Sequence, residues 1–145
     1  MADDAPLKLC AGDPEDLTVI SSVLQDALVT LGDMTYLPDE KSFVMAVNRF
    51  RWERGTDTRE RIVSGLRLDA VRNVQYRGID RIDRSQFLSF LVMYYTPDPD
   101  GDGGSVMIGF AGGGAIRIDV GGLYAALGDL GEAWPTLWTP EHDAD

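Results

Sequence analysis

The sequence predicts an α+β domain of mainly antiparallel β structure, in which about seven strands form a curled sheet or barrel with an N-terminal helix and a C-terminal capping helix. Three features predict this class: a helix-start signal at Asp13, runs of β-branched and aromatic residues from 27 to 120, and a short helical repeat after Gly122. The length of 145 residues fits a single domain, 1–145, with 1–6 and 135–145 as loose termini.

The first helix is predicted by the segment AGDPEDLTVISSVLQDAL. Asp13 can cap the helix, Pro14 suits its first position, and the acidic residues that follow favour the positive end of the helix dipole. Apolar residues then recur at helical spacing, at Leu17, Ile20 and Leu24. We expect the helix to begin near residue 14 and to end near Asp26; the alternative is an end at Gly32.

The middle of the chain reads as strands separated by turns rich in Gly, Pro and Asp. Because no helical crossovers intervene, we expect antiparallel pairing. The apolar run at 87–95 predicts a central strand that is buried on both faces, whereas AIRIDV alternates, with Arg117 and Asp119 pointing outward. The predicted strands span about 27–37, 42–52, 60–69, 71–78, 86–96, 104–111 and 114–120.

The segment LYAALGDLGEAW, residues 123–134, predicts a short helix that would close over the strands, because its apolar residues share one side. The tail contains Pro135 and Pro140, which oppose further helix. Seven strands followed by a capping helix resembles the element order of the pleckstrin-homology-like barrel.

Composition excludes several classes of function. The start of the chain has neither a basic region nor an apolar run, and no stretch is long enough to span a membrane, so we expect a cytoplasmic protein with no membrane partner. One cysteine, Cys10, and one histidine, His142, cannot form a zinc cluster, and no cofactor is predicted. The net charge of −11 argues against a nucleic acid partner.

Basic charge is nevertheless concentrated in one segment. Between Arg49 and Arg84 lie ten arginines and six acidic residues, a net charge of +4, which leaves −15 for the rest of the chain. Acidic flanks folding over this segment would explain the asymmetry without a ligand; a site for an anion or an acidic partner is the functional alternative.

Four of these arginines are candidate binding residues. Arg49 and Arg51 share one face of a predicted strand, and Arg61 and Arg67 share one face of the next. If RGTDT is a hairpin turn, all four lie on the same sheet face, with Arg51 across from Arg61. Like charges opposite each other are destabilising, so negatively charged groups must compensate these arginines. Nearby glutamates are the internal candidates, at positions 53 and 60, and a carboxylate or phosphate from outside is the alternative.

Two loops invite ligand-binding interpretations. In PDPDGDGGSV, the residues Asp98, Asp100 and Asp102 match the start of a calcium loop, but the bidentate glutamate is missing, because the twelfth position is Gly109. A hairpin turn is favoured, with a weak calcium site as the minor alternative. The glycines of GFAGGGAIRI lead into a strand without a lysine, which favours a hairpin turn with positive φ at residues 112–114 over a phosphate loop.

No catalytic constellation is apparent, so no catalytic residue is predicted. The leading hypothesis is a non-enzymatic binding or adaptor module that uses the arginine-rich sheet face toward a protein partner or a small anionic ligand. The alternative is a small enzyme with a carboxylate-based site, with or without a metal ion. Such a site would need a concave pocket that holds at least two acids.

Several motifs are specific enough to suggest a family: YLPDEKSFVMAVNRFRWE, the RGID at 77–80 and FAGGGAIRIDV. They resemble the family catalogued as domain of unknown function 2948, found mainly in alphaproteobacteria. The resemblance extends from LKLCAGDPEDL to the tryptophan of EAWPTLW. It implies a single bacterial cytoplasmic domain and transfers neither an activity nor any site residues.

Overall fold

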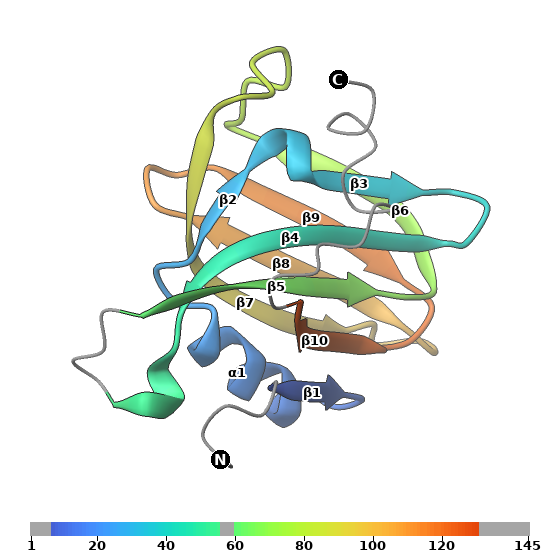
Figure 1. Cartoon of the computed structure of the whole chain (residues 1–145). Coiled ribbons are helices and arrows are strands. Elements are labelled where there is room, and N and C mark those ends of the chain that lie inside the picture. The colour runs from blue at the N-terminus through green and yellow to red at the C-terminus, as the bar shows by residue number, and fades with distance from the viewer. Residues whose placement is uncertain (1–6, 56–59, 131–145) are drawn as a thin grey trace.

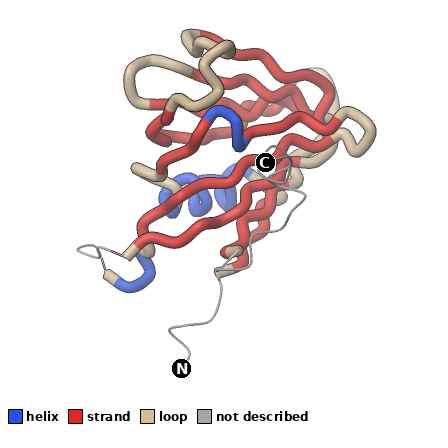
Figure 2. The backbone as a smooth tube through the Cα atoms, turned by 45° about the horizontal axis from the view of Figure 1, so that its top comes forward, coloured by secondary structure: helices blue, strands red, loops and turns tan. Residues whose placement is uncertain are grey.

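The computed structural model describes residues 7–55 and 60–130 (Figure 1). Within these residues, ten strands, one α-helix and two short 3-10 turns follow one another along the chain. The elements are β1 Lys8–Ala11, α1 Pro14–Val23, β2 Leu28–Thr30, η2 Leu31–Asp33, β3 Met34–Leu37, β4 Ser42–Phe50, η3 Trp52–Arg54, β5 Arg61–Leu68, β6 Val71–Arg77, β7 Phe87–Pro97, β8 Gly104–Phe110, β9 Ala115–Val120 and β10 Ala125–Asp129. The described part is therefore mainly antiparallel sheet, as predicted, but it has one α-helix where two were predicted (Figure 2).

The strands form one open sheet in the order β1-β10-β5-β4-β2-β7-β8-β9-β6, and β3 pairs with β4 beside this path. The strands at the two ends, β1 and β6, each pair with a single neighbour. The predicted curled sheet or barrel is therefore wrong. The pleckstrin-homology-like order is not confirmed either, because the described part has more than seven strands and a strand where the second helix was expected.

Helix α1 forms where the sequence predicts it. The Asp13 carboxylate accepts a hydrogen bond from the backbone N–H of Asp16 at 2.8 Å, and Pro14 occupies the first turn. The predicted apolar side, Leu17, Ile20 and Leu24, is buried. The helix ends slightly before Asp26, whose positive φ of 65° is incompatible with its continuation.

Four corrections concern the strands. The predicted strand 27–37 is two strands, β2 and β3, separated by η2, and the predicted strand 42–52 ends at Phe50 before η3. β1 was not predicted. The segment predicted as a capping helix instead contains β10, which is hydrogen-bonded between β1 and β5. Leu123 and Leu127 fit helical spacing, but Ala125 and Leu127 also fit the alternation of a strand. The segment forms a strand because it can pair with the edges of both β1 and β5. The rest of that predicted helix, 131–134, and the predicted loose termini lie outside the described residues.

The prediction that 87–95 is buried on both faces is also wrong. In β7, Phe90 and Met93 are buried, whereas Phe87 is 70% and Leu91 51% exposed. Pairing with β8 is irregular between Phe90 and Val92, which changes the face of the sheet toward which the following side chains point. β7 is central in the strand order but presents apolar side chains to solvent on one face.

Buried apolar side chains of α1 and of most of the described strands form one core. It includes residues of β4 and β5, such as Phe43 and Leu66, together with residues of β8 and β9, such as Ile108 and Ile116. In Figure 1, β4 and β5 lie in front of β8 and β9, and α1 lies at the lower end beside β1. None of the described helices has the length and apolar composition of a membrane span.

Candidate functional site

The hairpin that carries the predicted arginine face forms, but with a register that separates the arginines. β4 and β5 pair so that Phe50 lies opposite Arg61 and Arg49 opposite Ile62. Since opposite residues point to the same face, Arg61 lies on the outer face with Phe50, and Arg49 points inward. Arg51 lies beyond the last pair and its backbone N–H donates to Glu60 O at 2.9 Å. The predicted face with four arginines, and Arg51 across from Arg61, is therefore not formed.

Arg49 is fully buried in an ion-pair network. Its guanidinium donates to Asp129 Oδ1 at 2.9 Å and, through both terminal nitrogens, to the two carboxylate oxygens of Glu53 at 2.9 and 2.8 Å. Nε donates to Ser64 Oγ at 3.0 Å, and Nη1 also reaches Phe50 O at 2.9 Å. Every N–H group of this arginine thus has an acceptor within the chain.

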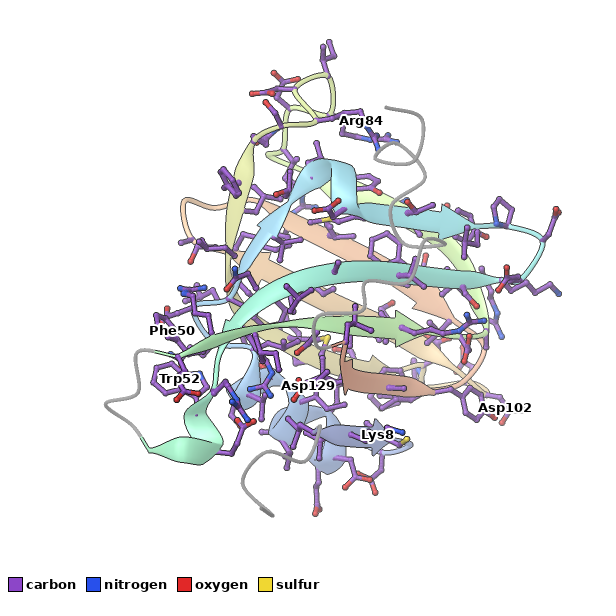
Figure 3. The ribbon with its side chains drawn as sticks, viewed as in Figure 1. Lys8, Phe50, Trp52, Arg84, Asp102 and Asp129 are labelled. Atoms are coloured by element: carbon purple, nitrogen blue, oxygen red, sulfur yellow. The ribbon has the colours of Figure 1, made fainter. Side chains whose placement is uncertain are left out.

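The network joins segments that are distant in sequence. The Asp129 carboxylate, whose side chain is 1% exposed, also accepts from Ser64 Oγ at 2.6 Å and from the Leu7 backbone N–H at 2.9 Å. It therefore ties β10 to β5, to β4 and to the residue before β1. Figure 3 shows Asp129, the last residue of β10, which pairs with Ser64 of β5.

The electrostatics of the network favour its charged form. Burial opposes the charge of Arg49, but hydrogen bonds and attraction from Glu53 and Asp129 outweigh it, so the pKa of Arg49 is raised. The hydrogen bond from Arg49 lowers the pKa of Glu53. This arginine is a structural cation and is not exposed to a ligand.

The other three predicted arginines also have partners within the chain. Arg51 Nη1 donates to Glu60 Oε1 at 3.0 Å. Arg61 Nη1 donates to the backbone and side-chain oxygens of one residue, Asn48, at 2.8 and 3.0 Å, and its guanidinium lies 3.9 Å from the centre of the Phe50 ring. The negative charges of Glu53 and Glu60 therefore compensate the positive charges of Arg49 and Arg51. These are the two glutamates that the sequence offered as internal partners for the arginines.

Arg67 is compensated as well. It donates to Asp69 Oδ1 at 2.8 Å and to Glu40 Oε1 at 3.2 Å, and the hydrogen bond that it donates to Asp69 raises the pKa of Arg67. Its side chain is 40% exposed. Phe50 and Trp52 are half-buried, with their ring centroids 5.1 Å apart.

A different group of arginines surrounds a hollow at the C-terminal end of β6. The hollow has a volume of about 440 Å³, and we call it the arginine pocket. Three of its residues are cationic, Arg77, Arg81 and Arg117, and the others are Val74, Gln75, Tyr76, Met107 and Ala115. The pocket contains no acidic side chain.

Strand pairing explains why these residues meet. In the β6–β9 pair, Gln75 lies opposite Arg117 and Arg77 opposite Ala115, so both arginines lie on the outer face. Ile116 and Ile118 point into the core, which confirms the predicted alternation of AIRIDV. Arg81 comes from the loop after β6 and stacks on Tyr76, with its guanidinium 4.2 Å from the ring centroid.

The charges of the arginine pocket are incompletely compensated. Arg117 Nε donates to Asp119 Oδ1 at 3.0 Å. Among the described residues, Arg77 and Arg81 have no carboxylate partner, in contrast to Arg49, Arg51 and Arg67. Burial raises the pKa of Tyr76, although Arg81 and Arg84 oppose the rise, so this hydroxyl stays a hydrogen-bond donor at neutral pH.

Comparison with known protein families identifies one family. The sequence model described as Protein of unknown function (DUF2948) matches residues 7–142, nearly the whole chain. The chain belongs to the DUF2948 family. No curated protein and no solved structure matches it.

The aspartate loop of this DUF2948 protein is a hairpin turn between β7 and β8. The Asp98 backbone N–H donates to Gly103 O at 2.9 Å, and Asp98, Asp100 and Asp102 are exposed. No group of three or more potential metal ligands occurs in 7–55 and 60–130. Figure 3 shows Asp102 at the end of the molecule away from Phe50 and Trp52. The glycine loop is also a hairpin turn, with positive φ at residues 112 and 113 but not at 114.

The arginine pocket of this DUF2948 protein was missed from the sequence, although one signal was available. The outward position of Arg117 followed from the alternation of its strand, and Arg77 lies near the end of the predicted strand 71–78. What the sequence did not show is that β6 pairs with β9, which lies about forty residues away along the chain, and that pairing brings the two arginines together.

Proposed function

We propose that this protein is a non-enzymatic binding module for anionic ligands and that the arginine pocket is its site. One observation carries the proposal. Arg77 and Arg81 have no carboxylate partner in the described chain, although it is strongly acidic overall and supplies acids to other arginines. Like charges held together in a hollow are destabilising unless an anion compensates them, so an external anion would stabilise this arrangement.

The pocket has donors suited to carboxylate and phosphate groups. Arginine presents a planar fork of N–H groups that matches both anions, and its charge persists at all physiological pH values. Gln75 and the Tyr76 hydroxyl add neutral donors, and Met107 and Val74 give an apolar wall. This combination suits an anionic group attached to an apolar body.

The net charge of −11 restricts the class of ligand. A long polyanion would extend beyond the pocket onto acidic surface, where it would be repelled. A small anion or a short acidic segment of a protein partner would contact only the arginines of the pocket and would not reach the acidic surface around it.

The four arginines predicted from the sequence support this function less well. Arg49 is buried, and Arg51, Arg61 and Arg67 already donate to groups of the chain. A ligand there would have to displace internal partners. The enzymatic alternative would need at least two acids in one hollow, whereas three hollows lined by described residues hold at most one acid, Asp33.

Titration with pyrophosphate, followed by isothermal calorimetry and by the amide shifts of residues 72–77, tests the proposal. We expect saturable binding that weakens about tenfold or more in Arg77→Glu and in Arg81→Glu, which is about 1.4 kcal/mol each. Arg67→Glu is the matched control, since it makes the same change of charge on β5. Equal binding by all variants, or none by the native protein, would contradict the proposal.

A further inference from the structure

β6 is a free sheet edge next to the arginine pocket. Among residues 7–55 and 60–130, β6 pairs with β9 on one side and no strand lies on the other. Apart from the Val71 N–H, which donates to Lys41 O at 2.8 Å, no residue of β6 makes a backbone hydrogen bond to a described segment other than β9. Alternate N–H and C=O groups of an edge strand point away from its neighbour, so β6 offers a template for another strand.

Hollows flank both ends of this edge. The arginine pocket lies at the C-terminal end, and a second hollow of about 420 Å³ lies at the N-terminal end. The second hollow is lined by Tyr36 from β3, by Lys41 from the following turn and by Arg72 from β6, among others. In Figure 1, β3 and β6 lie on the same side of the molecule.

Cationic side chains lie at both ends of this edge. Among the described residues, none of these cations has a carboxylate partner, and all are exposed; they are Lys41, Arg72, Arg77, Arg81 and Arg84. Figure 3 shows Arg84 in the loop that follows β6. The acids of that loop, Asp80 and Asp83, accept hydrogen bonds from groups of the loop itself.

We propose that β6 binds an extended acidic peptide segment of a partner protein as an added strand, with acidic side chains compensating the cations at the two hollows. This proposal rests on the proposed function and names its ligand class. Main-chain hydrogen bonds to β6 provide affinity, and alternate side chains provide specificity, as in other cases of strand addition.

The side chains on the two faces of β6 determine which residues the bound peptide segment needs at alternate positions. Val74 and Tyr76 are half-buried and lie opposite the core residues Ile118 and Ile116, so they form the rim of the core. Gln75 and Arg77 are exposed on the other face. A strand added about 4.8 Å from β6 would place its apolar residues beside Val74 and Tyr76 and its acids beside the arginines. The segment therefore alternates acidic and apolar residues.

Charge also decides between a partner and a second copy of this chain. Pairing of two β6 edges would bring cationic side chains of both copies together, which is unfavourable. An acidic strand turns the same charges into attraction. The edge therefore rejects self-association and admits a segment of opposite charge.

The test uses an N-acetylated, C-amidated peptide of sequence Thr-Glu-Val-Glu-Val-Glu-Thr and the full chain. We expect binding by calorimetry, together with slower hydrogen exchange of amides in 72–77. A peptide of the same sequence that is N-methylated at alternate residues keeps the charge but loses the donors, and we expect it to bind at least tenfold more weakly. Arg77→Glu and Arg81→Glu should weaken binding similarly, and Arg67→Glu should not.

The outcomes separate this inference from the proposed function. Pyrophosphate binding without peptide binding, or equal binding of the N-methylated peptide, overturns strand addition and leaves the anion site. Loss of both ligands overturns both proposals. Peptide binding that slows exchange elsewhere than in 72–77 also overturns the edge as the site. Thermal unfolding of each variant shows that a lost affinity is not a lost fold.

Discussion

At the scale of single residues, Arg49 shows how a buried charge is accommodated. A guanidinium without exposure to solvent is tolerated when each N–H meets an acceptor, and here Glu53, Asp129, Ser64 and a backbone oxygen supply them. Arg77 and Arg81 of the arginine pocket are the opposite case, because they are exposed and no carboxylate of the described residues pairs with them. We therefore assign Arg49 a structural role and propose the binding role for Arg77 and Arg81.

We expect Asp129→Ala to lower the free energy of unfolding by about 3 kcal/mol or more, because it leaves Arg49 buried beside a partly emptied site and also removes the acceptor for the Leu7 N–H. Urea denaturation measures the change. Asp102→Ala, in an exposed turn, is the control and should change stability by less than about 0.5 kcal/mol. A small effect of Asp129→Ala would show that the network contributes little to stability.

At the scale of elements, the turns depend on glycine where the backbone requires it. Gly103 closes the β7–β8 hairpin with φ of 100°, and a Cβ there would lie 2.3 Å from Val120 O. Gly101 in the same turn has open space around it. The aspartates of this loop are therefore explained by turn formation, and the glycine at 103 by conformation and by the close approach of β9.

We expect Gly103→Ala to destabilise the protein by about 2 kcal/mol or more, because a side chain at this φ is strained and clashes with backbone. Gly101→Ala should be nearly neutral. The midpoints of thermal unfolding of the two variants measure the difference. Equal midpoints would mean that the hairpin relaxes away from the clash.

At the scale of the whole molecule, ion pairs on separate elements make stability depend on pH. Hydrogen bonds and neighbouring arginines lower the pKa values of Glu53, Asp69 and Asp119 below their ordinary values of 4.5 and 3.8, despite the opposing effect of burial. Where a folded-state pKa is depressed, the unfolded state binds more protons as the pH falls. Their stabilising contribution is therefore complete above about pH 5 and is lost as the pH falls through the folded-state pKa values.

We expect the wild-type protein to lose stability relative to the variant Glu53→Gln/Asp69→Asn/Asp119→Asn as the pH is lowered from 7 to 3. Acidification also reduces the repulsion that accompanies a net charge of −11, and the comparison of the two proteins removes most of this common effect. Urea denaturation at several pH values measures the difference in free energy of unfolding. A difference that stays constant with pH would show that these pKa values are not depressed.

Local features of the fold were predictable because their causes are local. The cap at Asp13, the alternation of AIRIDV and the two glycine-containing hairpin turns follow from interactions within a few residues, and the structure contains each of them. The β4–β5 hairpin was also predicted, but its register was not. SFVMAVNRF has apolar residues on both faces, so the pattern does not tell which face is buried, and Arg49 was placed in solvent.

The sequence by itself determined the mainly antiparallel class, the first helix, the positions of most strands and an excess of arginine in the middle of the chain. Tertiary structure alone decided that Ala125–Asp129 is a strand between two open edges, that Arg49 is buried beside Asp129, and that Arg77 meets Arg117. The physical reason is the separation along the sequence of the residues that interact. Caps and turns depend on adjacent residues, whereas each of these outcomes depends on hydrogen bonds or ion pairs between strands that are distant in the chain.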